Sequence, residues 1–178
     1  LPDGNPAWRD AVLARAKAMY ERDKNHACVL IWSCGNESYG GETLKAMHDY
    51  LRQADPGRVV HYEGVAHDRR YNDTSDIESQ MYPPAAQVRE FLAEHRDKPM
   101  ILCEYGHSMG NSCGALEEYT ELAWQDPLYQ GGFLWEYMDH SLWRQLPDGR
   151  RVLVYGGDFG ERPHDGEFCT DGLVKIGR

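Results

Sequence analysis

The chain has 178 residues and a net charge of −10, from 29 acidic against 19 basic side chains. That length allows one domain with a real core. The negative charge argues against nucleic acid and against an anionic membrane surface as partners, because both attract clustered positive charge. No apolar run approaches the roughly 20 residues that cross a bilayer. A neutral partner such as a sugar fits this composition better.

The sequence begins at Leu1 with neither a Met nor a signal peptide, so we expect a piece of a longer protein. We expect a cytoplasmic protein, with the periplasm or secretion as alternatives. The cysteines are odd in number, widely spaced and without a C-x-x-C pair, which argues against a disulfide framework or a zinc site. Cys28 and Cys103 lie in apolar runs and are expected in the core, as is Trp32.

Helical spacing and short apolar runs alternate along the chain. In chain order they predict a helix at 6–23, a strand at 28–32, a helix at 41–54, a strand at 59–62, a loop at 63–75, a strand at 76–82, a helix at 85–95, a strand at 99–103, a helix at 112–125 and a strand at 132–135. After residue 142 the sequence turns into loop, with one expected strand at 152–155.

Strands that alternate with helices predict a parallel α/β sheet. About five strands come before residue 140, whereas a closed eight-stranded barrel takes about 250 residues. The chain is therefore either a short open sheet or a barrel without its first strands, and the abrupt start favours the barrel. We treat residues 1–178 as one domain.

Two acidic residues stand where apolar strands end: Glu37 shortly after residues 29–32, and Glu104 directly after residues 100–103. Catalytic groups of parallel α/β proteins gather at such strand ends. A salt bridge or a helix cap would be the structural explanation for either acid. Retaining glycosidases need two carboxyl groups about 5–5.5 Å apart, one as nucleophile and one as proton donor. At that distance the repulsion, roughly 3 kcal/mol, keeps one of them protonated.

Four segments, residues 25–38, 101–112, 131–136 and 155–160, resemble in this order the motifs of the glycoside hydrolase family 2 β-galactosidases. The resemblance implies a (β/α)8 TIM barrel of which this chain holds roughly strands 4 to 8, with Glu37 as general acid/base and Glu104 as nucleophile. It implies a β-galactoside substrate such as lactose, a homo-oligomeric parent enzyme, and an isolated piece that is inactive.

The same resemblance implies roles for further residues. Asn36 would bond the sugar 2-hydroxyl, Tyr82 would hydrogen-bond the nucleophile, and His107 and Trp135 would line the galactose pocket. It implies Mg²⁺ and Na⁺ but no organic cofactor: Glu37 would ligate Mg²⁺ with partners from upstream, and the Phe168 carbonyl and Asp171 would ligate Na⁺. Asp171 departs from the Asn usual in these β-galactosidases, although an acid can still ligate sodium.

Two other functions compete with this one. Residues 106–110, Gly-His-Ser-Met-Gly, match the nucleophile elbow of α/β-hydrolases, which would make Ser108 an esterase nucleophile. Against it, Glu104 would sit in the strand that leads to the elbow, where an apolar residue is wanted. A barrel that binds sugar without turning it over is the second competitor, but binding alone does not need two carboxylates.

Overall fold

The computed structural model describes residues 4–169 and 171–175. The α-helices are α1 (Arg9–Asp23), α2 (Glu42–Ala54), α3 (Ala85–Glu94) and α4 (Leu116–Gln125). The strands are β1 (Ile31–Ser33), β2 (Val59–His61), β3 (Glu78–Met81), β4 (Met100–Tyr105), β5 (Tyr129–Leu134), β6 (Leu142–Gln145) and β7 (Arg151–Val154). The 3₁₀ helices are η1 (Pro6–Trp8), η2 (Glu63–Ala66), η3 (Arg69–Thr74) and η4 (Gly166–Cys169).

The first five strands follow one another in chain order. β1 pairs with β2, and β4 lies between β3 and β5, all in parallel pairs. The two groups adjoin, because the Asp76 N–H donates to the Val60 carbonyl at 2.8 Å and His61 Nε2 lies 2.8 Å from Ser79 Oγ. The predicted parallel α/β arrangement is thus confirmed, with helices as the connections between successive strands.

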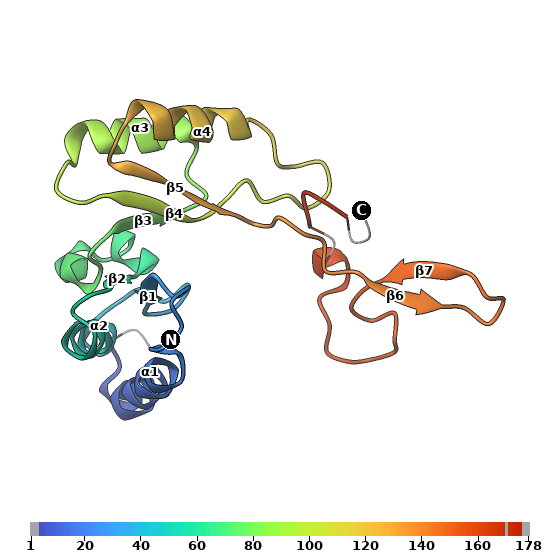
Figure 1. The fold of residues 1–178 in the computed structure, drawn as a ribbon, viewed down its shortest axis with the longest axis horizontal. Helices are drawn as coiled ribbons and strands as arrows, with labels where there is room; N and C mark the ends of the chain where they lie inside the picture. Colours follow the sequence, from blue (N-terminus) through green and yellow to red (C-terminus); the bar gives the residue numbers. More distant parts are fainter. Residues whose placement is uncertain (1–3, 170, 176–178) are drawn as a thin grey trace.

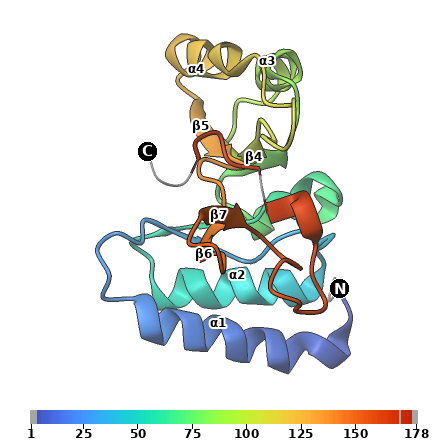
Figure 2. The ribbon, with the colours of Figure 1, turned by 90° about the vertical axis from the view of Figure 1, so that its right-hand side faces the viewer.

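Two apolar cores lie between the helices and the strands. Figure 2 shows α1 and α2 at one end of the molecule and α3 and α4 at the other. The buried side chains of the first core are Ala16, Trp32, Cys34, Leu44, Met47, Leu51, Val60, Tyr62 and Val65. Those of the second are Val88, Leu92, Met100, Leu102, Leu122 and Tyr129. Apolar side chains of the helices pack inward against the strands and hold them in place. The ends of the strands can then carry polar groups in fixed positions.

Most of the expected elements are confirmed, with shifted ends. Trp32 is 2% exposed, as expected of a core residue. The fourth helix begins at Leu116 and not at residue 112, because Cys113 and Ala115 adopt φ values of 69° and 57° that no right-handed helix allows. Cys28 is exposed, so its expected core position is wrong: β1 begins only at Ile31, and Cys28 lies in the turn before it.

The region after β5 holds a hairpin that the sequence did not reveal in full. β6 pairs antiparallel with β7, although only the second of these strands was expected. The hairpin projects away from the five parallel strands (Figure 1). The expected loop at 63–75 contains η2 and η3, two short 3₁₀ helices. Among the described residues, no helix combines the length and the apolar character that crossing a bilayer requires.

Candidate active site

Glu104 lies near the end of β4, where Tyr82 holds its carboxylate. The Tyr82 hydroxyl donates to Glu104 Oε2 at 2.5 Å, and the Tyr82 backbone N–H donates to the Glu104 carbonyl at 2.9 Å. Burial, the hydrogen bond to Glu104 and the nearby negative charges raise the pKa of the Tyr82 phenol. The phenol therefore keeps its proton at neutral pH and remains a donor to the carboxylate.

Glu37 follows β1 in an exposed turn that Glu63 anchors. The Glu37 backbone N–H donates to Glu63 Oε1 at 2.6 Å, and the Glu63 side chain is buried, with the residue 3% exposed. Burial raises the pKa of the Glu63 carboxyl, and the charges of Glu37 and Glu104 raise it further, against the lowering effect of the Glu37 N–H. Glu63 therefore lies within electrostatic reach of both predicted catalytic acids.

Glu63 is a site residue that the sequence patterns do not single out, because they predict only a loop at 63–75. The signal was available, because Glu63 comes two residues after the end of β2, just as the other two acids come at or after strand ends. The same rule that singled out Glu37 and Glu104 thus applies to Glu63.

A cavity of about 470 Å³ opens beside these groups. Its lining includes Asn36, His61, Glu63 and Glu104 together with apolar side chains such as that of Phe133. Burial lowers the pKa of His61 to about 4, so its imidazole is neutral at physiological pH. A cavity with apolar walls and a few convergent polar groups is the usual form of a small-molecule site.

Three of the predicted site residues share an unusual backbone conformation. Five non-glycine residues in the described part of the chain have φ in the left-handed region, and Glu37 (51°), Tyr82 (54°) and His107 (40°) are among them. Such a conformation costs of order 1–3 kcal/mol and persists only where the surroundings enforce it. Strained positions of this kind cluster at functional sites.

His107 continues the site beyond Tyr82. Its ring meets the Tyr82 ring edge-on, with centroids 5.4 Å apart, and lies 6.3 Å from the ring of Phe168. Trp135 follows β5, and its half-buried position is fixed through the backbone, because its N–H donates to the Tyr105 carbonyl and its carbonyl accepts from Ser108. The structure thus connects Tyr82, Glu104, His107 and Phe168 through direct contacts.

Residues 1–178 match the family described as "Glycosyl hydrolases family 2, TIM barrel domain". The chain belongs to glycosyl hydrolase family 2. It is 53% identical over 178 residues to a β-galactosidase of Clostridium acetobutylicum, and 52% identical over 178 residues to one of Lactobacillus delbrueckii subsp. bulgaricus. It covers all of its own length in both matches, but 20% and 17% of theirs. The chain therefore spans about a fifth of the length of these relatives.

Two solved structures support the barrel fold. A putative β-galactosidase from Bacteroides fragilis superposes with a TM-score of 0.64 at 14% identity, covering 94% of this chain and 28% of the other. A family 2 member from Bacteroides cellulosilyticus DSM 14838 gives a TM-score of 0.61 at 19% identity, covering 75% of this chain and 19% of the other. The expected TIM-barrel class is thereby confirmed for this family 2 chain.

Ser108, the nucleophile of the competing esterase hypothesis, has a structural role in this family 2 domain. Its Oγ accepts the Glu136 N–H at 2.9 Å and donates to the Glu136 and Asp171 carbonyls. Ser108 is buried, and a loop separates it from α4, whereas a nucleophile elbow exposes its serine at a strand-to-helix turn. The geometry therefore does not favour an esterase.

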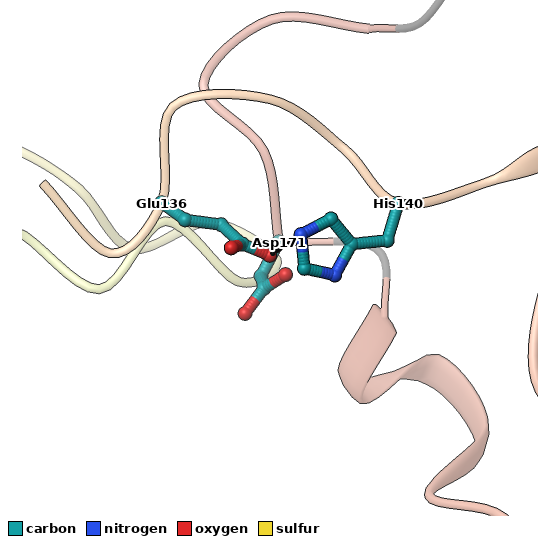
Figure 3. Close-up of side chains that lie close together, drawn as sticks. All are labelled: Glu136, His140 and Asp171. Carbon is teal, nitrogen blue, oxygen red and sulfur yellow. Dashed lines mark ion pairs between the residues drawn. The ribbon is translucent and has the colours of Figure 1, made fainter. Parts of the chain in front are cut away.

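Asp171 belongs to a second cluster of titratable side chains. Its carboxylate faces the side chains of Glu136 and His140, as Figure 3 shows. His140 Nε2 lies 2.9 Å from Glu136 Oε1. Burial, followed by the neighbouring Asp171 carboxylate, raises the pKa of the Glu136 carboxyl. Sequence reasoning had linked Asp171 only with Phe168, whose ring lies near His107.

Proposed function

We propose that this chain carries both catalytic carboxyl groups of a retaining β-galactosidase. The observation that carries the proposal is geometric: the Tyr82 hydroxyl donates to Glu104 at 2.5 Å, Glu63 accepts the Glu37 N–H at 2.6 Å, and Glu63 and Glu104 line one cavity. Two strand-end acids held in this way around one cavity suit a glycosidase pair. The β-galactosidases that share about half of this sequence support galactose as the sugar.

In the first step, Glu104 Oε attacks the anomeric carbon and the bond from that carbon to the aglycone oxygen breaks. Glu37 gives its proton to the leaving oxygen, so that an alcohol departs and a galactosyl ester of Glu104 remains. The Tyr82 hydroxyl keeps the Glu104 carboxylate in place for this attack, because it donates to Oε2 at 2.5 Å.

In the second step, the now ionised Glu37 takes a proton from water, and the water oxygen bonds to the anomeric carbon while the ester bond to Glu104 breaks. Galactose leaves with its original configuration after two inversions. Glu37 therefore works alternately as acid and base, and its exposed turn gives both the alcohol and the water access to its carboxyl group.

The remaining predicted site residues would recognise the sugar. Asn36 lines the cavity and is proposed to bond the 2-hydroxyl, where hydrogen bonds strengthen in the transition state. His107 and Trp135 are proposed to form a wall of the galactose pocket, because both are half-buried at or beyond the ends of β4 and β5. A half-buried aromatic ring offers a flat apolar face on which a sugar can stack.

We also propose that β1 to β5 are the fourth to eighth strands of the barrel, and that the activity belongs to a longer, homo-oligomeric protein. The cavity supports the barrel assignment, because its lining includes Ile31, Ile101 and Phe133, which the other strands of a closed barrel would cover. Phe133 is well exposed here. The 178-residue chain alone is therefore expected to be inactive on lactose and on other β-galactosides.

The residues of this structure suit one of the two metals that the family resemblance implies better than the other. The exposed Glu37 carboxylate suits Mg²⁺, a hard cation that prefers oxygen ligands, and the ion would supply positive charge beside this carboxylate. Asp171 offers two buried oxygens without hydrogen-bond partners among the described residues, which suits a cation. The His140 nitrogen close to Asp171, however, is a poor ligand for Na⁺.

The test uses the full-length protein and a panel of nitrophenyl β-glycosides. We expect the highest kcat/KM on the galactoside and release of galactose with retained configuration, followed by NMR. Glu104→Gln should abolish turnover of every substrate. Glu37→Gln should spare the first step for a dinitrophenyl galactoside, whose leaving group needs no proton, and so accumulate the galactosyl enzyme. Wild-type turnover by Glu104→Gln would refute the proposal.

A further inference from the structure

The side chains of Glu136, His140 and Asp171 converge on one point (Figure 3). Glu136 and His140 come from the segment that joins β5 to β6. One ligand atom from each lies within 4.8 Å of the others. Atoms that bind a common metal ion at about 2.0–2.2 Å are separated by at most about twice that distance. The three groups therefore need only a small contraction to contact one ion.

The buried carboxylate of Asp171 is the main evidence for a bound cation. It is 1% exposed, and neither of its carboxylate oxygens has a hydrogen-bond partner among the described residues. The carboxylate of Glu136, whose side chain is 16% exposed, lies beside it, so a second acidic group adjoins the buried one. A buried carboxylate is costly unless it is paired or coordinates a metal.

The backbone holds the ligands in place before any ion binds. The Leu173 N–H donates to the Glu136 carbonyl at 2.9 Å, and the Asp139 N–H donates to the Val174 carbonyl at 3.0 Å. Between the two segments, a Cβ on Gly172 would come within 1.8 Å of the Asp139 nitrogen, so only glycine allows this approach. A site on two cross-linked segments loses little conformational freedom on binding.

We propose that Glu136, His140 and Asp171 bind one divalent transition-metal cation, with Zn²⁺ as the best fit. An imidazole nitrogen with carboxylate oxygens is a typical Zn²⁺ ligand set, whereas Mg²⁺ and Ca²⁺ prefer oxygen alone. His140 is exposed, so the ion can enter from solvent and a water molecule can take the fourth position. This site shares Asp171 with the sodium site that the family resemblance implies, but its other two ligands, Glu136 and His140, are different. The proposal does not depend on the roles proposed for Glu37 and Glu104.

The ion would fasten the segment after β5 to the segment around Asp171. Ser108 already joins the same two segments through the Glu136 and Asp171 carbonyls, immediately after His107. Metal binding would thus stabilise the loops next to the proposed sugar pocket without touching the reacting atoms. The role of the ion would be structural. We therefore expect to detect it through metal affinity and thermal stability, and not through the rate of a reaction step.

The experiment measures Zn²⁺ binding to the metal-free full-length protein by calorimetry, in excess Mg²⁺ and Na⁺ so that oxygen-only sites are filled. Wild type should bind one Zn²⁺ at this site and gain thermal stability with it. His140→Ala removes an exposed ligand and should weaken this binding more than ~100-fold, beyond what loss of an outer hydrogen bond costs. His26→Ala, at another exposed histidine, is the matched control and should bind as wild type does.

Asp171→Asn keeps the size of the side chain and should also weaken Zn²⁺ binding. Co²⁺ in place of Zn²⁺ should give visible absorption bands that His140→Ala changes and His26→Ala does not. The proposal is overturned if wild type binds no Zn²⁺, or if His140→Ala and Asp171→Asn bind it as wild type does. It is equally overturned if Mg²⁺ or Na⁺ in excess prevents Zn²⁺ binding at this site.

Discussion

Replacement of Glu63 tests whether a buried acid positions the proposed proton donor. Glu63 accepts the Glu37 backbone N–H at 2.6 Å, and Glu37 has a left-handed φ of 51°. Glu63→Ala removes the acceptor and its charge, while Glu63→Gln keeps an acceptor oxygen without the charge. Glu118→Ala, on the exposed face of α4, is the matched control because it removes an exposed carboxylate that does not line the cavity.

The expected loss follows from the strength of that hydrogen bond. A hydrogen bond to a charged group contributes about 1.5–3 kcal/mol, and a neutral one about 0.5–1.5 kcal/mol. If the whole contribution serves to hold Glu37 in the transition state, Glu63→Ala should lower kcat/KM roughly 10- to 100-fold, because about 1.4 kcal/mol is a factor of ten. Glu63→Gln should fall between Glu63→Ala and wild type, with a loss of about tenfold or less.

The assay compares two galactosides in the full-length enzyme. Lactose has a poor leaving group that needs the Glu37 proton, whereas a dinitrophenyl galactoside leaves without one. A misplaced Glu37 should therefore reduce formation of the galactosyl enzyme from lactose much more than from the dinitrophenyl substrate, measured in single turnovers. Equal losses on both substrates, or full activity of Glu63→Ala on lactose, would refute a positioning role for Glu63.

Three further changes test other parts of the site. Tyr82→Phe removes the donor to Glu104 and should lower kcat/KM roughly 10- to 100-fold in steady-state assays, whereas an unchanged value would remove Tyr82 from the mechanism. His61 has a pKa lowered to about 4, so its contribution to stability is present above about pH 6.5 and is lost as the pH falls towards 4. Wild type should thus lose about 3 kcal/mol in that range, and a steeper fall of the melting temperature than in His61→Gln would show it. Ser108→Ala should cost about 1–3 kcal/mol of stability in denaturant unfolding yet keep turnover, and a complete loss of turnover in folded protein would instead favour a serine nucleophile.

Sequence patterns predicted the order of helices and parallel strands because each helix has an apolar face and each strand is a short apolar run. The rule that polar groups gather at strand ends also singled out Glu37 and Glu104, whose catalytic roles stay predictions. The same rule applied to Glu63 would have added a third acid. Glu63 was missed because residues 63–75 are polar and read as a loop. The 3₁₀ helix that contains Glu63 has only four residues, which is too short to give a recognisable hydrophobic period.

Other features depend on contacts that sequence spacing does not encode. The start of α4 moves to Leu116 because positive φ values at Cys113 and Ala115 break the helical pattern. The convergence of Asp171 with Glu136 and His140 depends on backbone pairing between segments that lie far apart in the sequence. A family resemblance assigns Asp171 a partner by position only, whereas the fold decides which side chains meet it.

The left-handed backbone at Glu37, Tyr82 and His107 links the stability of this domain to its proposed chemistry. At about 1–3 kcal/mol each, these conformations would relax unless other bonds opposed them. Glu63 holds the backbone of Glu37, and the backbone of Glu104 holds that of Tyr82. The Glu63 side chain thus opposes the strain at Glu37, while the Glu104 carboxylate also accepts the Tyr82 hydroxyl. Removing the side chain of Glu63 or Glu104 should therefore change the geometry of Glu37 or Tyr82, and losses of activity at these contacting positions should not be additive.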